Sequence, residues 1–407
     1  MKTFLRLIIA LLVLSSPAMA ADITIGTVFE ISGPNQATAQ EAMNGALLAV
    51  KQINGAKRGI NVKLEMRSTS GQPEDVLKTI NSFQEIKGLS AVTGLISDDA
   101  AMNAAPAMQA ADTTFLCTGA QTDGLAQSAG NCIFTLAVPD IRIGQLLADF
   151  AANTIQTGNI ALIRSDLSDS CARQADSFAR RFKHNGGKIM TEMRITEQNA
   201  DLGFIAAKLK DLIPPPPSNS TVTEDALGAS DFDDDGAVII TGKRDQSPAP
   251  PMVETVVIFA PAHMAAAVMK MLQKNDLVYR TIGGSSFDTV TMCSTINNWP
   301  GTVFYAAQAA LTREDPLVDD FVQKYTNLFG SAPQTGYSAM GFDSVMLLAD
   351  AAEKGGPESK SLRTALNGIT DFSGVSGKIS FHERAASKPL YIMQSQSGQI
   401  SLAAEVD

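Results

Sequence analysis

Short apolar runs alternate with longer amphipathic segments along the first third of the chain. The apolar run 23–31 predicts a strand, and residues 40–53 place their alanine, methionine, leucine and valine side chains on one face of a helix. The alternation continues with predicted strands at 61–66, 91–96 and 114–117 and predicted helices at 73–86 and 100–111. Such alternation is typical of a parallel sheet covered by helices on both faces, so we expect an α/β lobe here.

A second series of the same kind begins near Asp140. It comprises predicted helices at 143–154, 171–184, 202–212 and 262–274 and predicted strands at 159–163, 188–194, 255–259 and 280–283. Residues 303–307 predict a strand that crosses between lobes, and residues 342–354 predict a long amphipathic helix. We therefore expect two α/β lobes in series, with the chain crossing between them more than once.

The first twenty residues (1–20) have the features of a secretory signal peptide. Lys2 and Arg6 supply positive charge, the apolar run 5–14 is too short to span a bilayer, and Ala18-Met19-Ala20 is a small-residue cleavage site. Cleavage would make Ala21 the first residue of the mature chain, and no cysteine stands there to carry a lipid anchor. No later segment has the length and apolarity of a membrane span, so we expect a soluble, exported protein.

Length and charge narrow the possible functions. About 387 residues remain after removal of the signal peptide, more than one core usually supports, which again favours two lobes. The formal net charge of −10 becomes −12 without Lys2 and Arg6, which argues against nucleic acid or an anionic membrane surface as a partner. With 45% hydrophobic residues the chain can build a sizeable core, so global disorder is excluded.

Residues 214–251 break the alternating pattern. Two proline clusters enclose a Ser/Thr/Asn-rich stretch and an acidic cluster, a composition too polar and breaker-rich for a core. We interpret the segment as a surface insertion within the second lobe, with 238–241 as a short added strand. The stretch 231–236 has aspartate at its first, third and fifth positions and glycine at its sixth, like the start of a calcium loop. Because Gly242 stands where a bidentate glutamate is needed, a solvated acidic loop is favoured and no metal site is predicted.

Polar loops follow several of the predicted strands. In parallel sheets, ligands bind at the carboxyl ends of the strands, where loops expose backbone groups and helix N-termini. The loops of this kind are Ser32-Gly33-Pro34, Ser97-Asp98-Asp99 and Thr118-Gly119-Ala120-Gln121 in the first lobe, and 165–170, 260–263 and Ser285-Ser286-Phe287 in the second. Two facing rims of loops would form a cleft, although every α/β lobe has such loops whether or not it binds a ligand.

Asp98 and Asp99 allow two interpretations. If they face the cleft, their carboxylates would bind a cationic group of the ligand, and each charge-assisted hydrogen bond would contribute about 1.5–3 kcal/mol. At the start of the helix predicted from Ala100, either one would act as an N-cap, a position that favours aspartate. We favour capping by at least one of the two. His263 likewise either lines the cleft or merely begins a helix, and exposure is the simpler expectation.

Beyond these local patterns, the chain resembles a known family over nearly all of its mature length. Its motifs resemble the opening of the leucine/isoleucine/valine-binding protein family, the type I periplasmic binding proteins of ABC importers, at Ile25-Gly26, Ser32-Gly33-Pro34, Asn44-Gly45-Ala46 and Ile53-Asn54-Gly55. Residues 342–351 and 374–381 resemble the late helix and closing strand of that family. The resemblance implies two Rossmann-like lobes with parallel sheets, a hinge of three crossings, and closure around a small ligand. It places the first lobe at 21–140 plus 309–377 and the second at 141–308 plus 378–407.

The resemblance also implies where the ligand binds. Thr38 stands where the family often has a tyrosine over the ligand, Ala262-His263 where it has an aromatic residue, and Ser285-Ser286 where it has an acidic residue for the ammonium group. Together with the polar loops, the candidate ligand-binding residues are Ser32, Thr38, Asp98, Asp99, Thr118, Gly119, Ala120, Gln121, Asp169, Ser170, Ala262, His263, Ser285 and Ser286. These departures from the family pattern leave the identity of the ligand open.

The lobe division makes a prediction for the four cysteines, Cys117, Cys132, Cys171 and Cys293. Export permits disulfides, and four cysteines allow three pairings. None lies in a CxxC or His-rich context, so a zinc site is not expected. Pairing within each lobe leaves the hinge free and predicts Cys117–Cys132 and Cys171–Cys293.

No sequence motif indicates an enzyme. The chain lacks GxSxG, HExxH and P-loop sequences, and its 3 histidines stand in unrelated contexts. The resemblance implies a monomeric periplasmic protein without a cofactor, which binds a small amino-acid-like ligand and passes it to an ABC permease in the inner membrane. The alternative is a periplasmic receptor of the same fold that reports its ligand to a sensor or another envelope protein.

Overall fold

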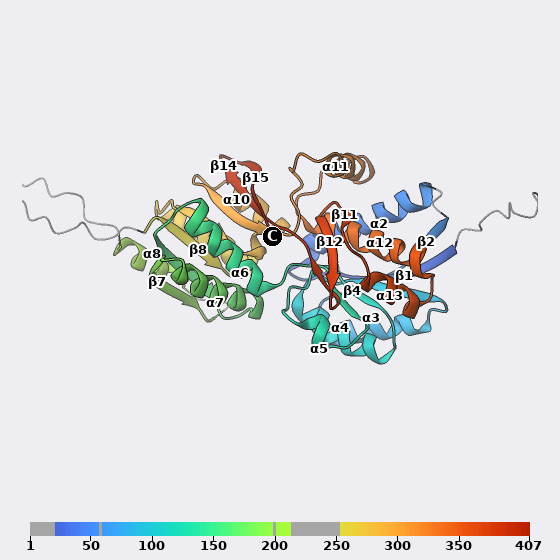
Figure 1. Cartoon of the computed structure of the whole chain (residues 1–407). Coiled ribbons are helices and arrows are strands. Elements are labelled where there is room, and N and C mark those ends of the chain that lie inside the picture. Colours follow the sequence, from blue (N-terminus) through green and yellow to red (C-terminus); the bar gives the residue numbers. More distant parts are fainter. Residues whose placement is uncertain (1–20, 57–58, 198–200, 213–252) are drawn as a thin grey trace, which may run out of the picture.

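The structure is a computed structural model that describes residues 21–56, 59–197, 201–212 and 253–407. Two α/β lobes lie side by side, each built on one sheet with helices on both faces (Figure 1). The predicted α/β fold class with two lobes is therefore confirmed. The predicted signal peptide, the insertion at 214–251 and its acidic stretch lie outside the described residues.

The first sheet contains eight strands of the described residues in the order β11-β12-β13-β5-β4-β3-β1-β2. The strands are β1 (Ala21–Glu30), β2 (Ile60–Thr69), β3 (Leu89–Gly94), β4 (Phe115–Cys117), β5 (Ile133–Thr135), β11 (Phe372–Gly374), β12 (Gly377–His382) and β13 (Ala385–Ser387). Neighbouring strands from β2 to β5 are parallel. One face packs on α2 (Gln36–Gly55), α11 (Pro316–Phe329), α12 (Tyr337–Gly355) and α13 (Ser359–Asn367). The other packs on α3 (Pro73–Ser82), α4 (Asp98–Ala110) and α5 (Leu125–Ser128).

The second sheet contains seven strands of the described residues in the order β15-β14-β10-β9-β8-β6-β7. The strands are β6 (Asn159–Ser165), β7 (Lys188–Ile195), β8 (Thr255–Phe259), β9 (Arg280–Gly283), β10 (Val303–Ala307), β14 (Leu390–Gln396) and β15 (Gln399–Val406). One face packs on α6 (Asp140–Asp149) and α7 (Asp169–His184). The other packs on α8 (Gly203–Lys210), α9 (Ala262–Lys274) and α10 (Val290–Asn297).

Helices α2 and α12 come from distant parts of the chain and pack closely in the first lobe. A Cβ added at Gly45 would lie 1.9 Å from the carbonyl oxygen of Ser338, and one at Gly341 would lie 1.9 Å from the carbonyl oxygen of Ala42. Only glycine allows two helix backbones to approach this far. The contact joins the N-terminal part of the lobe to the part that follows the second lobe in sequence.

Within the described residues the chain crosses between the two sheets three times, after β5, β10 and β13. Gln308 in the second crossing binds the first: its Oε1 accepts from the Val138 N–H at 2.9 Å, and its Nε2 donates to the Val138 carbonyl at 3.2 Å. The Lys388 ammonium in the third crossing donates to the carbonyl of Gln308. We call Val138, Gln308 and Lys388 the hinge cluster.

One lobe boundary differs from the expected division. β12 pairs with β11 and β13, and Ala385 of β13 pairs with Thr135 of β5. Residues 378–387 therefore lie in the first sheet, although the resemblance placed them in the second lobe. The reason is hydrophobic, because Ile379 and Phe381 are buried in the core of the first lobe.

The predicted disulfides are not formed, and all four cysteines are free thiols. Cys117 lies opposite Thr135 in the β4–β5 pair, so Cys132 is displaced by three residues, about 10 Å, along the neighbouring strand. That separation exceeds the reach of a disulfide. Cys171 packs in the core beneath α6 and α7, whereas Cys293 belongs to α10 on the opposite face of the sheet.

Candidate functional site

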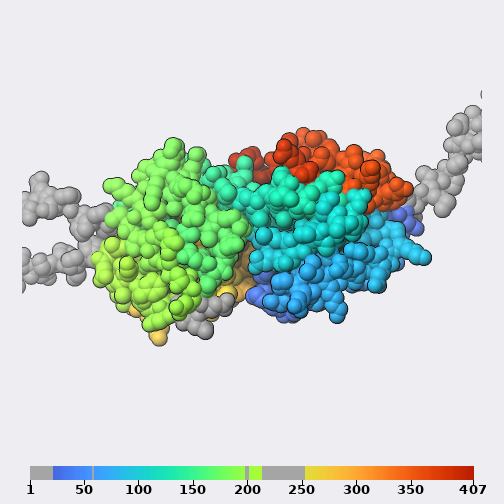
Figure 2. Space-filling view, turned by 90° about the horizontal axis from the view of Figure 1, so that it is seen from below, coloured from blue at the N-terminus to red at the C-terminus, as the bar shows by residue number. Residues whose placement is uncertain are grey.

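A cavity of about 620 Å³ lies between the lobes, at the carboxyl ends of the parallel strands. The two lobes meet directly on the face shown in Figure 2. Loops of both lobes line the cavity, and its wall includes the N-terminal residues of α4, α7 and α9. First-turn N–H groups of a helix lack intrahelical partners, so these three helix starts bring hydrogen-bond donors to one space.

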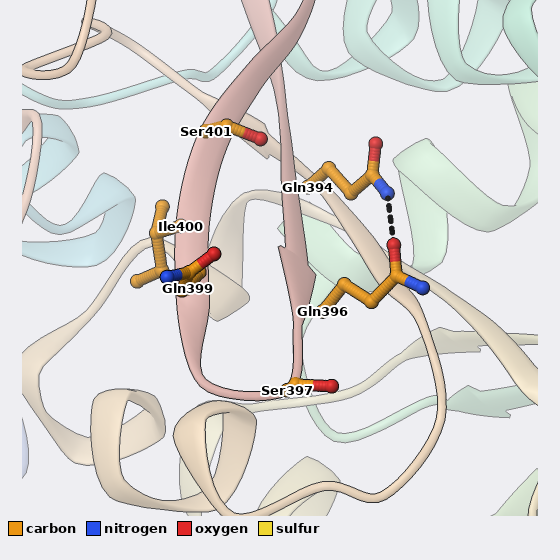
Figure 3. A pocket seen from close by; sticks show the side chains of 6 residues that line it. All are labelled: Gln394, Gln396, Ser397, Gln399, Ile400 and Ser401. Carbon is orange, nitrogen blue, oxygen red and sulfur yellow. Dashed lines mark hydrogen bonds between the residues drawn. The ribbon is translucent and has the colours of Figure 1, made fainter.

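A second hollow, of about 610 Å³, lies on the hairpin formed by β14 and β15. Among the described residues its lining belongs to that hairpin alone, and Figure 3 shows polar side chains around it, with Gln394 donating to Gln396 at 3.2 Å. Within the same part of the chain, it receives no group from the other lobe and no charged side chain. The cavity between the lobes is therefore the candidate ligand site.

Asp98 contacts the second lobe instead of capping its helix. It is the first residue of α4, whose N-cap position is held by Ser97 without a side-chain hydrogen bond. Its Oδ1 accepts from the Gln121 N–H at 2.6 Å, and its Oδ2 lies 2.6 Å from Nη2 of Arg173 in the other lobe. The cationic partner expected for Asp98 is thus present, and it belongs to the protein.

Arg173 also binds Asp140, the first residue of α6. The Nη2 and Nε atoms of Arg173 lie 2.8 and 3.0 Å from Oδ2 of Asp140. The other oxygen of Asp140 accepts from Ser170 Oγ and Gln174 Nε2, both at 2.7 Å. Burial raises the pKa of the Asp140 carboxyl to about 7, and the charge of Asp98 adds to the rise. We call Asp98, Asp140 and Arg173 the ion cluster.

Beside the ion cluster, two glutamines join the lobes through their amides. Gln121 Oε1, from the first lobe, accepts from Ser285 Oγ at 2.8 Å and from Gln174 Nε2 at 3.2 Å, both in the second. Gln174 Oε1 accepts from the Ser285 N–H at 3.1 Å, and Gln121 Nε2 donates to the Tyr337 hydroxyl at 3.2 Å. Gln121 and Gln174 are buried, 4% and 2% exposed, so these bonds are shielded from water.

The structure places ten of the predicted residues on the wall of the cavity: Asp98, Asp99, Gly119, Gln121, Asp169, Ser170, Ala262, His263, Ser285 and Ser286. The other four lie elsewhere. Ser32 is exposed away from the lining, and Ala120 packs in the core beneath α4. Thr118 is fully buried against the hydroxyl of Thr93, and Thr38 accepts from the Val290 N–H in the other lobe at 3.2 Å.

Sequence reasoning named Ser170 but missed Arg173 and Gln174 on the same helix, which make several of the contacts between the lobes. Ser170, Arg173 and Gln174 are spaced i, i+3 and i+4 on α7, a spacing that puts them on one helix face. This polar face near the helix start was the available signal. Tyr337 begins α12, where nothing in the local pattern separates it from a core residue. No group of metal-ligating side chains occurs among the residues that the structure describes.

A family model described as periplasmic binding protein matches residues 22–399. The chain belongs to the periplasmic binding protein family. Two curated relatives are the Leu/Ile/Val-binding protein homolog 3 of Brucella melitensis, 24% identical over 47% of this chain, and the Leu/Ile/Val-binding protein BraC3 of Rhizobium johnstonii, 22% identical over 52% of it. The matches span 52% and 57% of those relatives, so this periplasmic binding protein aligns with little more than half of their length.

Solved structures similar to this periplasmic binding protein share its fold over most of the chain. The branched-chain amino acid transporter substrate-binding protein LivJ of Streptococcus pneumoniae, in complex with isoleucine, has a TM-score of 0.75 at 19% identity and covers 95% of this chain and 99% of its own. A solute-binding protein of Rhodopseudomonas palustris, in complex with 3,4-dihydroxy benzoic acid, has a TM-score of 0.73 at 18% identity, with coverages of 95% and 97%. The expected type I periplasmic binding protein fold and the resemblance to the leucine/isoleucine/valine-binding proteins are confirmed.

Proposed function

We propose that this protein is the periplasmic substrate-binding component of an ABC importer, which holds a small amino-acid-like solute between its lobes and closes over it. One observation carries the proposal: both lobes supply the wall of the cavity of about 620 Å³ at the carboxyl ends of their strands, with apolar and polar side chains. A solute bound there would contact both lobes at once, so its binding would favour the closed arrangement. The signal peptide expected from residues 1–20 supports a periplasmic location.

The chemistry of the wall favours a solute with a carboxylate. The solutes bound in two similar structures, isoleucine and 3,4-dihydroxy benzoic acid, differ in the rest of the molecule but share a carboxylate. In this protein the starts of α4, α7 and α9 meet the cavity, and helix N-termini favour anions. The hydroxyl of Ser286 adds a buried polar atom without a partner among the described residues.

Binding without catalysis fits the polar groups of the cavity. Its lining contains one histidine, and His263 is an exposed residue at the start of α9. Cys171 lies on the wall, but burial raises the pKa of its thiol to about 12, so it carries no thiolate at neutral pH. The proposed partner of the monomeric protein is an inner-membrane permease.

The test is a panel of amino acids and organic acids scored by thermal shift, with hits measured by calorimetry and small-angle scattering. We expect at least one solute to raise the melting temperature and to reduce the radius of gyration on binding. Uptake of that solute should then require both this protein and a permease. A tight solute that leaves the radius of gyration unchanged would contradict binding by lobe closure, and unaffected uptake would contradict the transport role.

A further inference from the structure

Among the described residues, Arg173 is the one basic side chain near the cavity that forms ion pairs with carboxylates of both lobes. Its Nη2 lies 2.6 Å from Asp98 and 2.8 Å from Asp140, and its Nε lies 3.9 Å from Asp123. Asp98 and Asp123 belong to the first lobe, whereas Asp140 begins α6 in the second. The guanidinium is planar and has five donors, so it can donate hydrogen bonds to carboxylates on two sides. An ammonium group is less suited to this geometry.

The contacts of Arg173 differ in what happens to them when the lobes separate. α6 and α7 pack against one another in the second lobe, so the pair with Asp140 moves as one unit. The pair with Asp98 joins α7 to α4 and must break. Because the side chains of Arg173 and Asp98 are only 27% and 13% exposed, breaking it replaces a largely dry contact by hydration of Asp98, while Arg173 keeps its pair with Asp140.

The same contacts engage both oxygens of Asp98 with groups of the protein. One of its oxygens accepts from the Gln121 N–H and the other pairs with Arg173. Both oxygens of Asp140 are occupied as well, by Arg173 on one side and by Ser170 and Gln174 on the other. The remaining acidic residues on the described wall are Asp99 and Asp169, and both are exposed.

We propose that the Asp98–Arg173 pair is a closing ion pair, which stabilises the closed arrangement of the lobes by itself, and that Asp98 is a closure residue and not an acceptor for the ammonium group of a solute. The inference rests on the proposed function, because it assigns a control element to the same cleft. It goes further by stating that part of the closing free energy comes from the protein and is independent of the solute bound.

The first test uses the purified full chain without any solute. Small-angle scattering at low salt compares the wild type with Asp98→Asn and Arg173→Gln. Asp98→Asn keeps the shape of the side chain and an oxygen for the Gln121 N–H, and it leaves the Arg173–Asp140 pair in place. The matched control is Arg181→Gln on the same helix, because Arg181 pairs with Asp149 inside the second lobe at 2.6 Å. We expect both cluster variants to have a larger radius of gyration than the wild type and the control to be unchanged.

Melting curves accompany the scattering, so that an unfolded variant is recognised. If Arg173→Gln does not fold, Asp98→Asn decides alone, because it removes only the arm that crosses between the lobes. A folded Asp98→Asn protein with the wild-type radius of gyration would overturn the proposal. This test needs no solute, so its outcome is independent of whether the proposed transport function holds.

The second test separates closure from ammonium recognition with a matched pair of probes, leucine and isocaproate, which is leucine without its amino group. A lower closed fraction reduces the apparent affinity for every solute by the same factor. We expect Asp98→Asn to weaken the binding of both probes equally, by about tenfold if the closed fraction falls tenfold. Loss confined to leucine would overturn the proposal and make Asp98 an ammonium acceptor. If no probe or panel solute binds the wild type, the proposed function fails and the scattering result still decides the closing ion pair.

Discussion

At the hinge, an amide and a buried lysine join the crossings of the chain, and at the mouth of the cleft an amide pair and an arginine join the two lobes. The groups are similarly buried: Gln308 and Lys388 of the hinge cluster are 1% and 5% exposed, and Gln121 and Gln174 at the mouth are 4% and 2% exposed. The two sets of groups differ in how the chain connects them. Hinge residues lie on the segments that connect the lobes, whereas Gln121 and Gln174 lie on separate lobes.

This difference decides which contacts the protein can afford to lose. When the lobes separate, each polar group at the mouth replaces its partner in the other lobe by water. Hydrogen bonds to the partner and to water have similar free energies, so the exchange changes stability little. We expect no such exchange for the hinge groups, because they lie on the segments that connect the lobes and bind one another there. Burial alone therefore does not show whether a contact serves stability or function, and the topology of the chain must be read with it.

The largest expected effect is at the hinge. Gln308→Ala removes both hydrogen bonds to Val138 and leaves a buried N–H and a buried carbonyl without partners, at a cost of about 1–3 kcal/mol each. We expect the free energy of unfolding in urea to fall by about 2–4 kcal/mol, while the protein that remains folded binds solute normally. The control Gln394→Ala loses one bond on the surface hairpin and should stay within about 0.5 kcal/mol of the wild type. Equal urea midpoints for both variants would contradict the role given to Gln308.

At the mouth, the opposite result is expected. Gln121→Leu keeps the volume of the side chain but removes its bonds to Ser285 and Gln174. Because those partners can be hydrated when the lobes open, we expect a loss of stability below about 1 kcal/mol. Affinity for the best solute of the panel should fall by about tenfold or more, since the closed arrangement loses its central contacts. Calorimetry and urea unfolding on the same samples measure affinity and stability together. A large loss of stability with intact affinity would contradict this prediction.

The contact that Asp288 makes between the lobes is expected to depend on pH. Asp288 contacts the other lobe through Oδ1, which accepts from the Gly336 N–H at 3.1 Å, while its Oδ2 has no partner among the described residues. Burial raises the pKa of Asp288 to about 7, backbone hydrogen bonds from Gly336 and Gln308 oppose the rise, and the nearby charges are Glu41 and Lys388.

A raised carboxyl pKa means that the folded state binds a proton which the unfolded state has released. The contribution to stability is therefore fully present below the unfolded value near 3.8 and is lost as the pH rises through about 7. We expect Asp288→Asn to flatten the decline of unfolding free energy between pH 5 and 8, by on the order of 1 kcal/mol relative to the wild type. The exposed control Asp320→Asn should reproduce the wild-type curve. Parallel curves for Asp288→Asn and the wild type would contradict the shift.

Hydrophobic periodicity predicted the architecture because each helix and each parallel strand buries a regular face. Strand 255–259 and helix 262–274 coincide with β8 and α9. The hairpin of β14 and β15 was missed, although β14 begins with the apolar run 390–393; β14 then continues into polar residues, and β15 is only partly buried. α11 was missed as well, although Asp315, whose side chain accepts from the Leu317 N–H, and Gly330 with φ of +82° mark its two ends.

The candidate site was predicted at the level of loops and not of contacts. Loops at strand ends are fixed by topology, and this rule placed Ser97–Asp99, Gln121 and Ser285 at the cavity. Partners across the cleft depend on how the lobes meet, which no local pattern encodes. Arg173 therefore stayed unnoticed. The sequence favoured a capping role for Asp98 or Asp99, and the alternative took the cation from the ligand and not from the protein.

The smallest effect is expected for Asp99, the neighbour of Asp98 in the sequence. Asp99 is exposed at the rim of the cavity, and the contact recorded for it is a backbone one, its carbonyl accepting from Asn103 Nδ2 at 2.7 Å. Asp99→Asn should change stability by less than about 0.5 kcal/mol, as surface substitutions usually do. Its affinity for leucine and for isocaproate should stay within about twofold of the wild type, because a hydrated carboxylate contributes little to binding. Calorimetry of Asp98→Asn and Asp99→Asn side by side measures how the position of each carboxylate affects the affinity for the solute. A loss of leucine affinity confined to Asp99→Asn would show that Asp99, and not Asp98, receives the ammonium group.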